Sequence, residues 1–242
     1  MIQQLRVSAV VPHERASLLK RVPILADLSD DALEQVARSC VWRSCDAGKQ
    51  IVGYQDPSTD VFFLLSGKAR AIIHSSKGKD VVFVDLKATM MFGEIAAIDH
   101  RPRSASIEAL ETCLIASLSS DAYEKLMRRE PSVAIATLRH VTAEVRRLSE
   151  RVLEFSTLVV QNRIQAELLR LAGEAGERHG EAVLSPAPSL SDIADRISTH
   201  REAVSRELSR LAGIGLLERQ GGNLRITNLA RLATLVNEAK EE

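Results

Sequence analysis

The sequence contains no apolar run long enough to cross a membrane. Its longest apolar stretches are short, as at residues 81–84, whereas a transmembrane helix needs about 20 apolar residues in succession. The first residues form a brief apolar patch followed by His13, Glu14 and Arg15, without the regions of a secretory signal peptide. We therefore expect a cytoplasmic protein without a membrane partner.

Cysteine is scarce. Cys40, Cys45 and Cys113 are odd in number and scattered, which argues against a disulfide framework. Cys40 and Cys45 alone are too few for a zinc or iron–sulfur site, which wants about four ligands. We expect reduced cysteines, no metal and no covalent cofactor.

Net charge of either sign is absent as well. The 32 Lys and Arg residues balance the 32 Asp and Glu residues, so the whole surface is not a basic cover for nucleic acid. Charge that binds DNA must then be local, and motifs have to identify it. The sequence also lacks a Walker loop and a nucleophile–base pair, and we expect no enzyme.

The chain is long enough for two domains. It has 242 residues, of which 45% are hydrophobic and 26% charged, the balance of an ordinary globular protein. Residues from about 22 to 120 alternate short apolar runs with turn signals. The runs are 50–52, 61–65, 69–73, 81–84 and 114–118, and the turns are 46–48, 55–58 and 75–78. This spacing predicts a β-barrel or β-roll, preceded by a short helix at 29–40 with Ser29 as N-cap.

From Pro131 to about Gly173 the sequence has a long helical pattern, without glycine or proline between these two residues. Apolar residues recur in steps of four and three, a heptad seam typical of a helix that pairs with another helix. The seam comprises Ala134, Leu138, Val141, Val145, Leu148, Val152, Phe155 and Val159. The simplest partner is a second copy of the chain, and the alternative is that the stripe packs on the chain's own β-roll. The expected dimer interface comprises Leu138, Val141, Val145, Leu148, Val152 and Phe155.

The segment 189–211, SLSDIADRISTHREAVSRELSRL, has the pattern of two helices joined by a tight turn. Ser189 or Ser191 would cap the first helix, the turn falls at Ser198 and Thr199, and Thr199 would cap the second. Two short runs around Gly221 and Gly222 then predict a β-hairpin. Helix, turn, helix and hairpin in this order indicate a winged helix that reads the major groove of double-stranded DNA. The expected DNA-binding residues are Thr199, His200, Arg201, Glu202, Ser205, Arg206 and Arg210.

Residues 92–106, FGEIAAIDHRPRSAS, have the features of an anion site. A strand runs through Gly93 into a short helical turn, whose backbone N–H groups suit a phosphate. Arg103 carries a planar fork of donors for phosphate oxygens, and Ser104 adds a hydroxyl.

These residues resemble the phosphate-binding cassette of the CRP/FNR (cyclic-AMP receptor protein) family, and the resemblance covers almost the whole chain. It implies a bacterial transcription regulator of the α+β class. The cyclic-nucleotide-binding-like β-roll would span 1–128, a central dimerisation helix 129–159 and a winged helix-turn-helix 160–242. The effector would be a cyclic nucleotide, cAMP or cGMP, and RNA polymerase a further partner.

The resemblance also implies roles for particular residues. Glu94 would bind the ribose 2′-OH and Arg103 the cyclic phosphate, and the base-reading residues would be Arg201, Glu202 and Arg206. The expected ligand-binding residues are Gly93, Glu94, Ile95, Ala96, Arg103, Ser104, Leu148 and Ser149.

Two positions depart from the family pattern. Thr89 and Met90 stand where the family has Gly-Asp, and Leu148-Ser149 stand where the cAMP-responsive member has Thr-Ser. Leucine cannot hydrogen-bond a purine, so cGMP, another nucleotide or a loosened selectivity stay open. So does an effector-blind β-roll with constitutive DNA binding.

Overall fold

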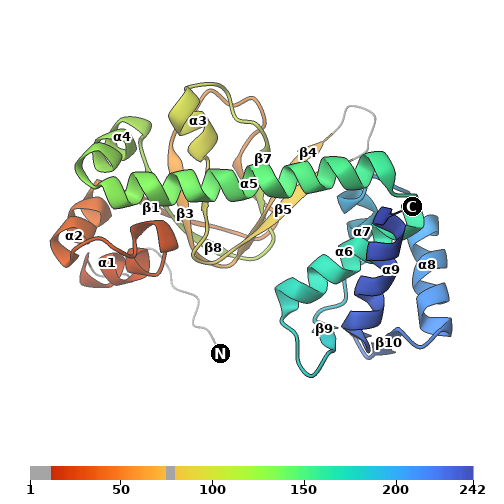
Figure 1. Cartoon of the computed structure of the whole chain (residues 1–242). Coiled ribbons are helices and arrows are strands. Elements are labelled where there is room, and N and C mark those ends of the chain that lie inside the picture. The colour runs from red at the N-terminus through yellow and green to blue at the C-terminus, as the bar shows by residue number, and fades with distance from the viewer. Residues whose placement is uncertain (1–11, 75–79, 242) are drawn as a thin grey trace. The chain divides into compact units, whose positions relative to one another are not determined.

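The computed structural model describes residues 12–74 and 80–241 (Figure 1). The chain divides into two compact units by its internal contacts. One contains the residues up to Ile73 together with Val82–Glu144, and the other contains Val145–Glu242 together with His74–Val81. The predicted turn at 75–78 lies outside the described residues.

The first unit is a β-roll flanked by helices. Its elements are α1 (Pro12–Lys20), the 3-10 helix η2 (Pro23–Leu25), α2 (Asp30–Ser39), β1 (Val41–Cys45), β2 (Gln50–Val52), β3 (Val61–Ser66), β4 (Lys68–His74), β5 (Asp80–Lys87), β6 (Met91–Phe92), α3 (Glu94–Asp99), β7 (Ser106–Ala109), β8 (Cys113–Leu118) and α4 (Ser120–Arg129). Two four-stranded sheets form the roll, with strand orders β1-β8-β3-β6 and β2-β7-β4-β5. All five strand runs predicted from the sequence are strands.

Strand β3 shows how the roll is packed. Because side chains alternate between the two faces of a strand, Val61 and Phe63 join the core under the helices while Phe62 and Leu64 join the core between the sheets. Both faces are therefore covered, and the strand is apolar along its whole length instead of alternating.

Helices α2 and α4 pack over the first sheet and start with matching caps. The Ser29 hydroxyl accepts a hydrogen bond from the amide of Ala32, as predicted, and Ser119 caps α4 through Ala122 in the same way.

Burial raises the pKa of the Cys40 thiol to about 12, so this free cysteine stays protonated at neutral pH.

The long helix α5 (Pro131–Thr157) begins at the proline expected to start it. The helical pattern of the sequence continues to about Gly173, but Val159 is extended and α6 (Val160–Ala175) starts as a separate helix. The end of α5 lies within two residues of the expected end of the central helix at residue 159.

The second unit packs four helices on a small sheet around one apolar core. Its further elements are β9 (Ala182–Leu184), α7 (Leu190–Arg196), α8 (Arg201–Gly213), β10 (Leu217–Gln220), β11 (Asn223–Ile226) and α9 (Leu229–Glu241). The hairpin predicted at Gly221-Gly222 is β10–β11, and β9 pairs with β11 as a third strand that the sequence did not indicate. The architecture is thus α+β: a β-rich N-terminal unit, the long helix α5 and a C-terminal helix-turn-helix with a wing.

Within residues 12–74 and 80–241, no helix combines the length and the apolar character that a membrane span requires. The same residues contain no cluster of three or more His, Cys, Asp or Glu side chains that could hold a metal ion.

Candidate effector and DNA-binding sites

Gly93 joins β6 to α3 where only a glycine fits. Its φ of 84° lies in the left-handed region, and a Cβ there would come within 2.8 Å of both Arg103 Nη1 and the carbonyl oxygen of Asp60. The missing side chain therefore lets Arg103 approach the backbone.

Arg103 is a nearly buried cation: it is 3% exposed, and no carboxylate among the described residues forms a salt bridge with it. Its Nη1 donates to the carbonyl of Gly93 at 3.0 Å and its Nε to the hydroxyl of Ser58 at 3.2 Å, while the guanidinium lies 5.2 Å from the centre of the Phe62 ring. Its Nη2 is buried without a hydrogen-bond partner among the described residues. A buried donor of this kind is costly unless a ligand or water satisfies it.

The guanidinium of Arg103 keeps its positive charge in this buried position. Burial lowers the pKa of its guanidinium from the ordinary value, and the carboxylates of Asp60, Asp56 and Glu94 oppose that shift. The guanidinium nevertheless stays charged, because no side chain in proteins has a higher ordinary pKa. A buried cation with a free donor fits a phosphate group.

Glu94 begins α3 and is 7% exposed. Its Oε1 lies 3.6 Å from Nε2 of His140 on α5. The structure thus brings together Gly93, Glu94 and Arg103, the first and last of which are directly hydrogen-bonded.

The remaining predicted ligand residues differ in their surroundings. Ala96 is buried in α3, Ile95 is 50% exposed and Ser104 is exposed. Leu148 and Ser149 belong to the second unit, where the Ser149 hydroxyl bonds the carbonyl of Val145. All these roles stay predictions.

Sequence reasoning missed Ser58 and His140. Ser58 was part of a predicted turn, and it reaches Arg103 across 45 residues of chain. His140 directly precedes the seam residue Val141. No local pattern marks either side chain as part of a site, since tertiary packing alone brings them there.

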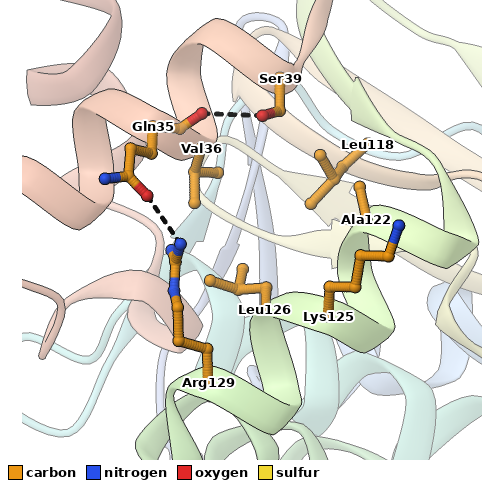
Figure 2. A pocket seen from close by; sticks show the side chains of 8 residues that line it. All are labelled: Gln35, Val36, Ser39, Leu118, Ala122, Lys125, Leu126 and Arg129. Carbon is orange, nitrogen blue, oxygen red and sulfur yellow. Dashed lines mark hydrogen bonds between the residues drawn. The ribbon is translucent and has the colours of Figure 1, made fainter.

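A cavity of about 220 Å³ lies between α2 and α4 (Figure 2). Arg129 Nη1 donates to Gln35 Oε1 at 2.7 Å across one side of it, and the Ser39 hydroxyl donates to the carbonyl of Gln35. It is lined by Gln35, Val36, Ser39, Leu118, Ala122, Lys125, Leu126 and Arg129. None of these is a predicted ligand residue, so the cavity is separate from the Arg103 site.

The helix-turn-helix is formed as predicted, with one correction. Ser189 caps α7 through the amide of Asp192, and Ser198 takes a φ of 53° in the turn. The prediction that Thr199 caps the second helix was wrong. His200 is the N-cap of α8 and makes no side-chain cap, while Thr199 donates its backbone amide to the carbonyl of Ala194.

Helix α8 has one buried and one exposed face. Val204, Leu208 and Leu211 are buried in the core of the second unit. The predicted DNA-contacting side chains that are exposed are His200, Arg201, Glu202, Ser205, Arg206 and Arg210, whereas Thr199 is half-buried. A polar face near the start of such a helix is what the major groove accepts.

Two arginines of the second unit are held by carboxylates. Arg210, one of the predicted DNA-binding residues, forms two hydrogen bonds of 2.8 Å to Glu207, which is 5% exposed. On the wing, Arg225 bonds Glu181 and Glu218, whereas Arg219 is exposed. Arg219 is thus the better candidate of the two wing arginines for a phosphate contact.

A buried ionic cluster connects the end of α5 to α6 and α7. The Glu167 carboxylate, 1% exposed, accepts from Arg151 at 2.7 Å, from Arg196 at 3.4 Å and from Arg170. Arg170 also bonds Glu154 of α5, and Arg196 also bonds Asp192 of α7. Arg151 further donates to the carbonyl of Arg196, the last residue of α7. The cluster therefore fixes α7, the first helix of the DNA-reading pair, to its neighbours.

The predicted seam of α5 is largely exposed on the single chain. Val141 is half-buried, and the exposed members are Leu138 (63%), Val145 (58%), Leu148 (41%), Val152 (65%) and Phe155 (39%). Val133 and Thr137, each one position before a seam residue, are instead buried in the first unit. The stripe of Val133 and Thr137 is therefore covered, whereas the predicted seam beside it is largely uncovered.

Comparison with known proteins assigns each half of the chain to a domain type. A family model described as a cyclic nucleotide-binding domain matches residues 42–130, and one described as a Crp-like helix-turn-helix domain matches residues 162–235. Gly93, Glu94 and Arg103 lie within the first segment, and the exposed face of α8 lies within the second.

Whole-chain relatives have the same combination of units. A CRP-like cAMP-activated global transcriptional regulator of Mycobacterium tuberculosis is 22% identical over 217 residues, 89% of this chain and 97% of the relative. The cyclic AMP receptor protein of Thermus thermophilus is 29% identical over 221 residues, 88% and 96% of the two chains. The solved structure of CLP, a c-di-GMP-responsive global regulator of Xanthomonas campestris, matches with a TM-score of 0.70 at 18% identity, covering 82% of this chain and 99% of CLP.

Proposed function

Because the chain belongs to the CRP/FNR family of DNA-binding transcription regulators, we propose that it is a homodimer whose DNA binding is controlled by a nucleotide. The family places an effector domain before the helix-turn-helix, and its effectors differ between members: one relative is named for cAMP and one for c-di-GMP. The finer proposal for this chain is a cyclic nucleotide, cAMP or cGMP.

The observation that carries the effector proposal is the buried, unpartnered Nη2 of Arg103. A phosphate oxygen at this nitrogen would satisfy the donor and bring a negative charge to a desolvated cation. Glu94, also buried, would then accept the ribose 2′-OH. In a β-roll that binds no effector, the buried charges of Arg103 and Glu94 would have no ligand to contact. This effector-blind β-roll is the alternative to be tested.

The homodimer proposal rests on the exposed seam of α5. Apolar side chains that recur every three or four residues on an uncovered helix face suit a copy of the same helix. A two-fold dimer would present its two α8 helices about 34–36 Å apart, one turn of B-DNA, and so the DNA site would be an inverted repeat.

Effector control would work through a shift between two packings of the dimer. A nucleotide that binds one packing more tightly raises the population of that packing relative to the other. The increase is set by the ratio of the nucleotide's affinities for the two packings. In our proposal the favoured packing spaces the two α8 helices correctly for DNA. RNA polymerase would be the further partner, and the cytoplasm the location.

The direct test is calorimetric titration of nucleotide-stripped protein with cAMP, cGMP and c-di-GMP. We expect wild type to bind a cyclic nucleotide and Arg103→Leu to lose about 2–5 kcal/mol of binding free energy, because the anion loses its buried partner. Arg101→Leu, two positions away and exposed, is the matched control and should bind like wild type. Equal affinity of wild type and Arg103→Leu would reject the site, and no binding of any nucleotide by wild type would favour the effector-blind alternative.

A further inference from the structure

Helix α5 supplies a histidine to the carboxylate of Glu94. Nε2 of His140 lies 3.6 Å from Oε1 of Glu94, and their side chains are 27% and 9% exposed. Both residues belong to the first unit. A carboxylate this far from water needs a partner to stay both charged and oriented.

The rotation of α5 fixes where this histidine points. His140 continues the stripe of Val133 and Thr137, which are buried against the first unit at helical spacing. The Thr137 hydroxyl lies 2.6 Å from the hydroxyl of Tyr123 on α4 and donates to the carbonyl of Val133. The same helix face therefore carries His140 to Glu94, while the next residue, Val141, belongs to the predicted seam.

We propose that His140 is a positioning residue of the effector site, which holds Glu94 so that its second oxygen accepts a ribose hydroxyl. The inference rests on the proposed function, since it takes Glu94 as the residue that binds the sugar. It adds a specificity determinant on α5, next to the surface that would form the dimer.

The surroundings of the pair determine its response to pH. The nearby carboxylate of Glu94 is the main factor that raises the pKa of His140 above its ordinary value of 6.5, with Glu144 on the same helix contributing and burial opposing. Tyr123 of α4 and Arg103 of the cassette loop are the other titratable groups that interact with Glu94. Because the folded-state pKa is raised, the pair contributes fully below about pH 6.5 and is lost as pH rises through the folded-state pKa.

The test is the preference for the ribose 2′-OH, measured as the ratio of the Kd of 2′-deoxy-cAMP to the Kd of cAMP. Calorimetry on the full-length protein compares wild type, His140→Leu and His140→Lys at about pH 6 and about pH 8.5. We expect His140→Leu to reduce the ratio roughly tenfold at the lower pH, since Glu94 loses the charged partner that orients its carboxylate toward the ribose hydroxyl. The ratio of wild type should fall toward that of His140→Leu at the higher pH. His140→Lys, which stays charged throughout, should show a ratio that does not change with pH.

A matched control is His100→Asn, because His100 also pairs with a glutamate, Glu124 at 3.1 Å, but makes no contact with Glu94. Its ratio should equal that of wild type at both pH values. A ratio in His140→Leu equal to that of wild type would overturn the proposal.

A second measurement needs no nucleotide and separates this inference from the proposed function. Urea midpoints of wild type, Glu94→Gln, His140→Leu and the double variant give the coupling between the two side chains. We expect a coupling at about pH 6 that disappears at about pH 8.5. If wild type binds neither cAMP nor cGMP, the proposed function fails, and this cycle alone decides the pair: coupling supports the pair and additive shifts overturn it.

Discussion

The arginines of the C-terminal unit fall into two classes by what their guanidinium groups contact. Arg225 and Arg210 are held by carboxylates of their own unit, Glu181 and Glu207. Arg206 on α8 and Arg219 on the wing are exposed. An arginine already bonded in two places to a carboxylate has fewer donors left for DNA, so the second class should carry the DNA contacts.

Arg206 is expected to read a base. An arginine on the exposed face of a recognition helix can bond O6 and N7 of one guanine with two donors. This contact favours guanine over the other bases by about 1–3 kcal/mol. Arg206→Ala should therefore relax the preference at one G·C pair in each half-site. Selection of binding sites from random DNA measures this, and a selected motif identical to that of wild type would contradict it.

Arg219 is the comparison for Arg206. A wing arginine is expected to contact phosphate, which carries no sequence information, so Arg219→Ala should weaken binding to all sequences alike. The slope of log affinity against log salt should fall by roughly one unit for each subunit's lost contact. A changed motif with an unchanged slope would reverse the roles of the two arginines.

At the scale of elements, α5 should hold two chains together through its exposed seam. Leu148→Glu would place a charge beside its like charge from the second copy, so we expect monomers or a much weaker dimer in analytical ultracentrifugation. Leu153→Glu is the matched control, because Leu153 is 56% exposed on the same helix but outside the seam. An unchanged dimer in Leu148→Glu, or monomers in both variants, would place the interface elsewhere.

The ionic cluster around Glu167 should stabilise the second unit. Glu167→Gln would leave Arg151, Arg170 and Arg196 crowded in a buried site without their shared carboxylate. Breaking a buried ion pair typically costs about 3–5 kcal/mol, which would appear as a lower urea midpoint. The exposed Glu177→Gln should change stability by no more than about 0.5 kcal/mol. Equal midpoints for the two variants would show that the cluster contributes nothing.

The periodic spacing of apolar residues predicted those elements whose buried face is set by the local sequence pattern. The buried side of α8, with Val204, Leu208 and Leu211, follows from helical spacing alone, and so does the start of α5 at Pro131. The exact end of α5 at Thr157 does not, because no glycine or proline follows it before Gly173 and the helical pattern continues.

The candidate effector site was predictable only in part, for the same reason. Gly93, Glu94 and Arg103 form a short sequence pattern, and the structure brings them together. Their supporting side chains, Ser58 and His140, come from distant segments that only the folded β-roll and α5 bring near. The unpartnered Nη2 of Arg103 is likewise a property of burial that no motif shows.

For the whole molecule, we propose that a nucleotide at Arg103 is coupled to the spacing of two α8 helices across a dimer. Such coupling between two sites is reciprocal and is typically worth about 1–3 kcal/mol. The selected DNA site should therefore be an inverted repeat, and a site bound by the wild-type dimer without two-fold symmetry would conflict with the proposed assembly.

The most direct test of this account is the affinity of the full-length protein for its selected DNA at constant salt, with and without saturating cyclic nucleotide. We predict that the nucleotide that binds in calorimetry tightens DNA binding by about 5–150-fold in wild type. In Arg103→Leu the same nucleotide concentration should leave the DNA affinity unchanged, while the variant binds DNA as nucleotide-free wild type does. A wild-type DNA affinity that is the same with and without bound nucleotide would contradict the claim that this regulator is gated by its effector.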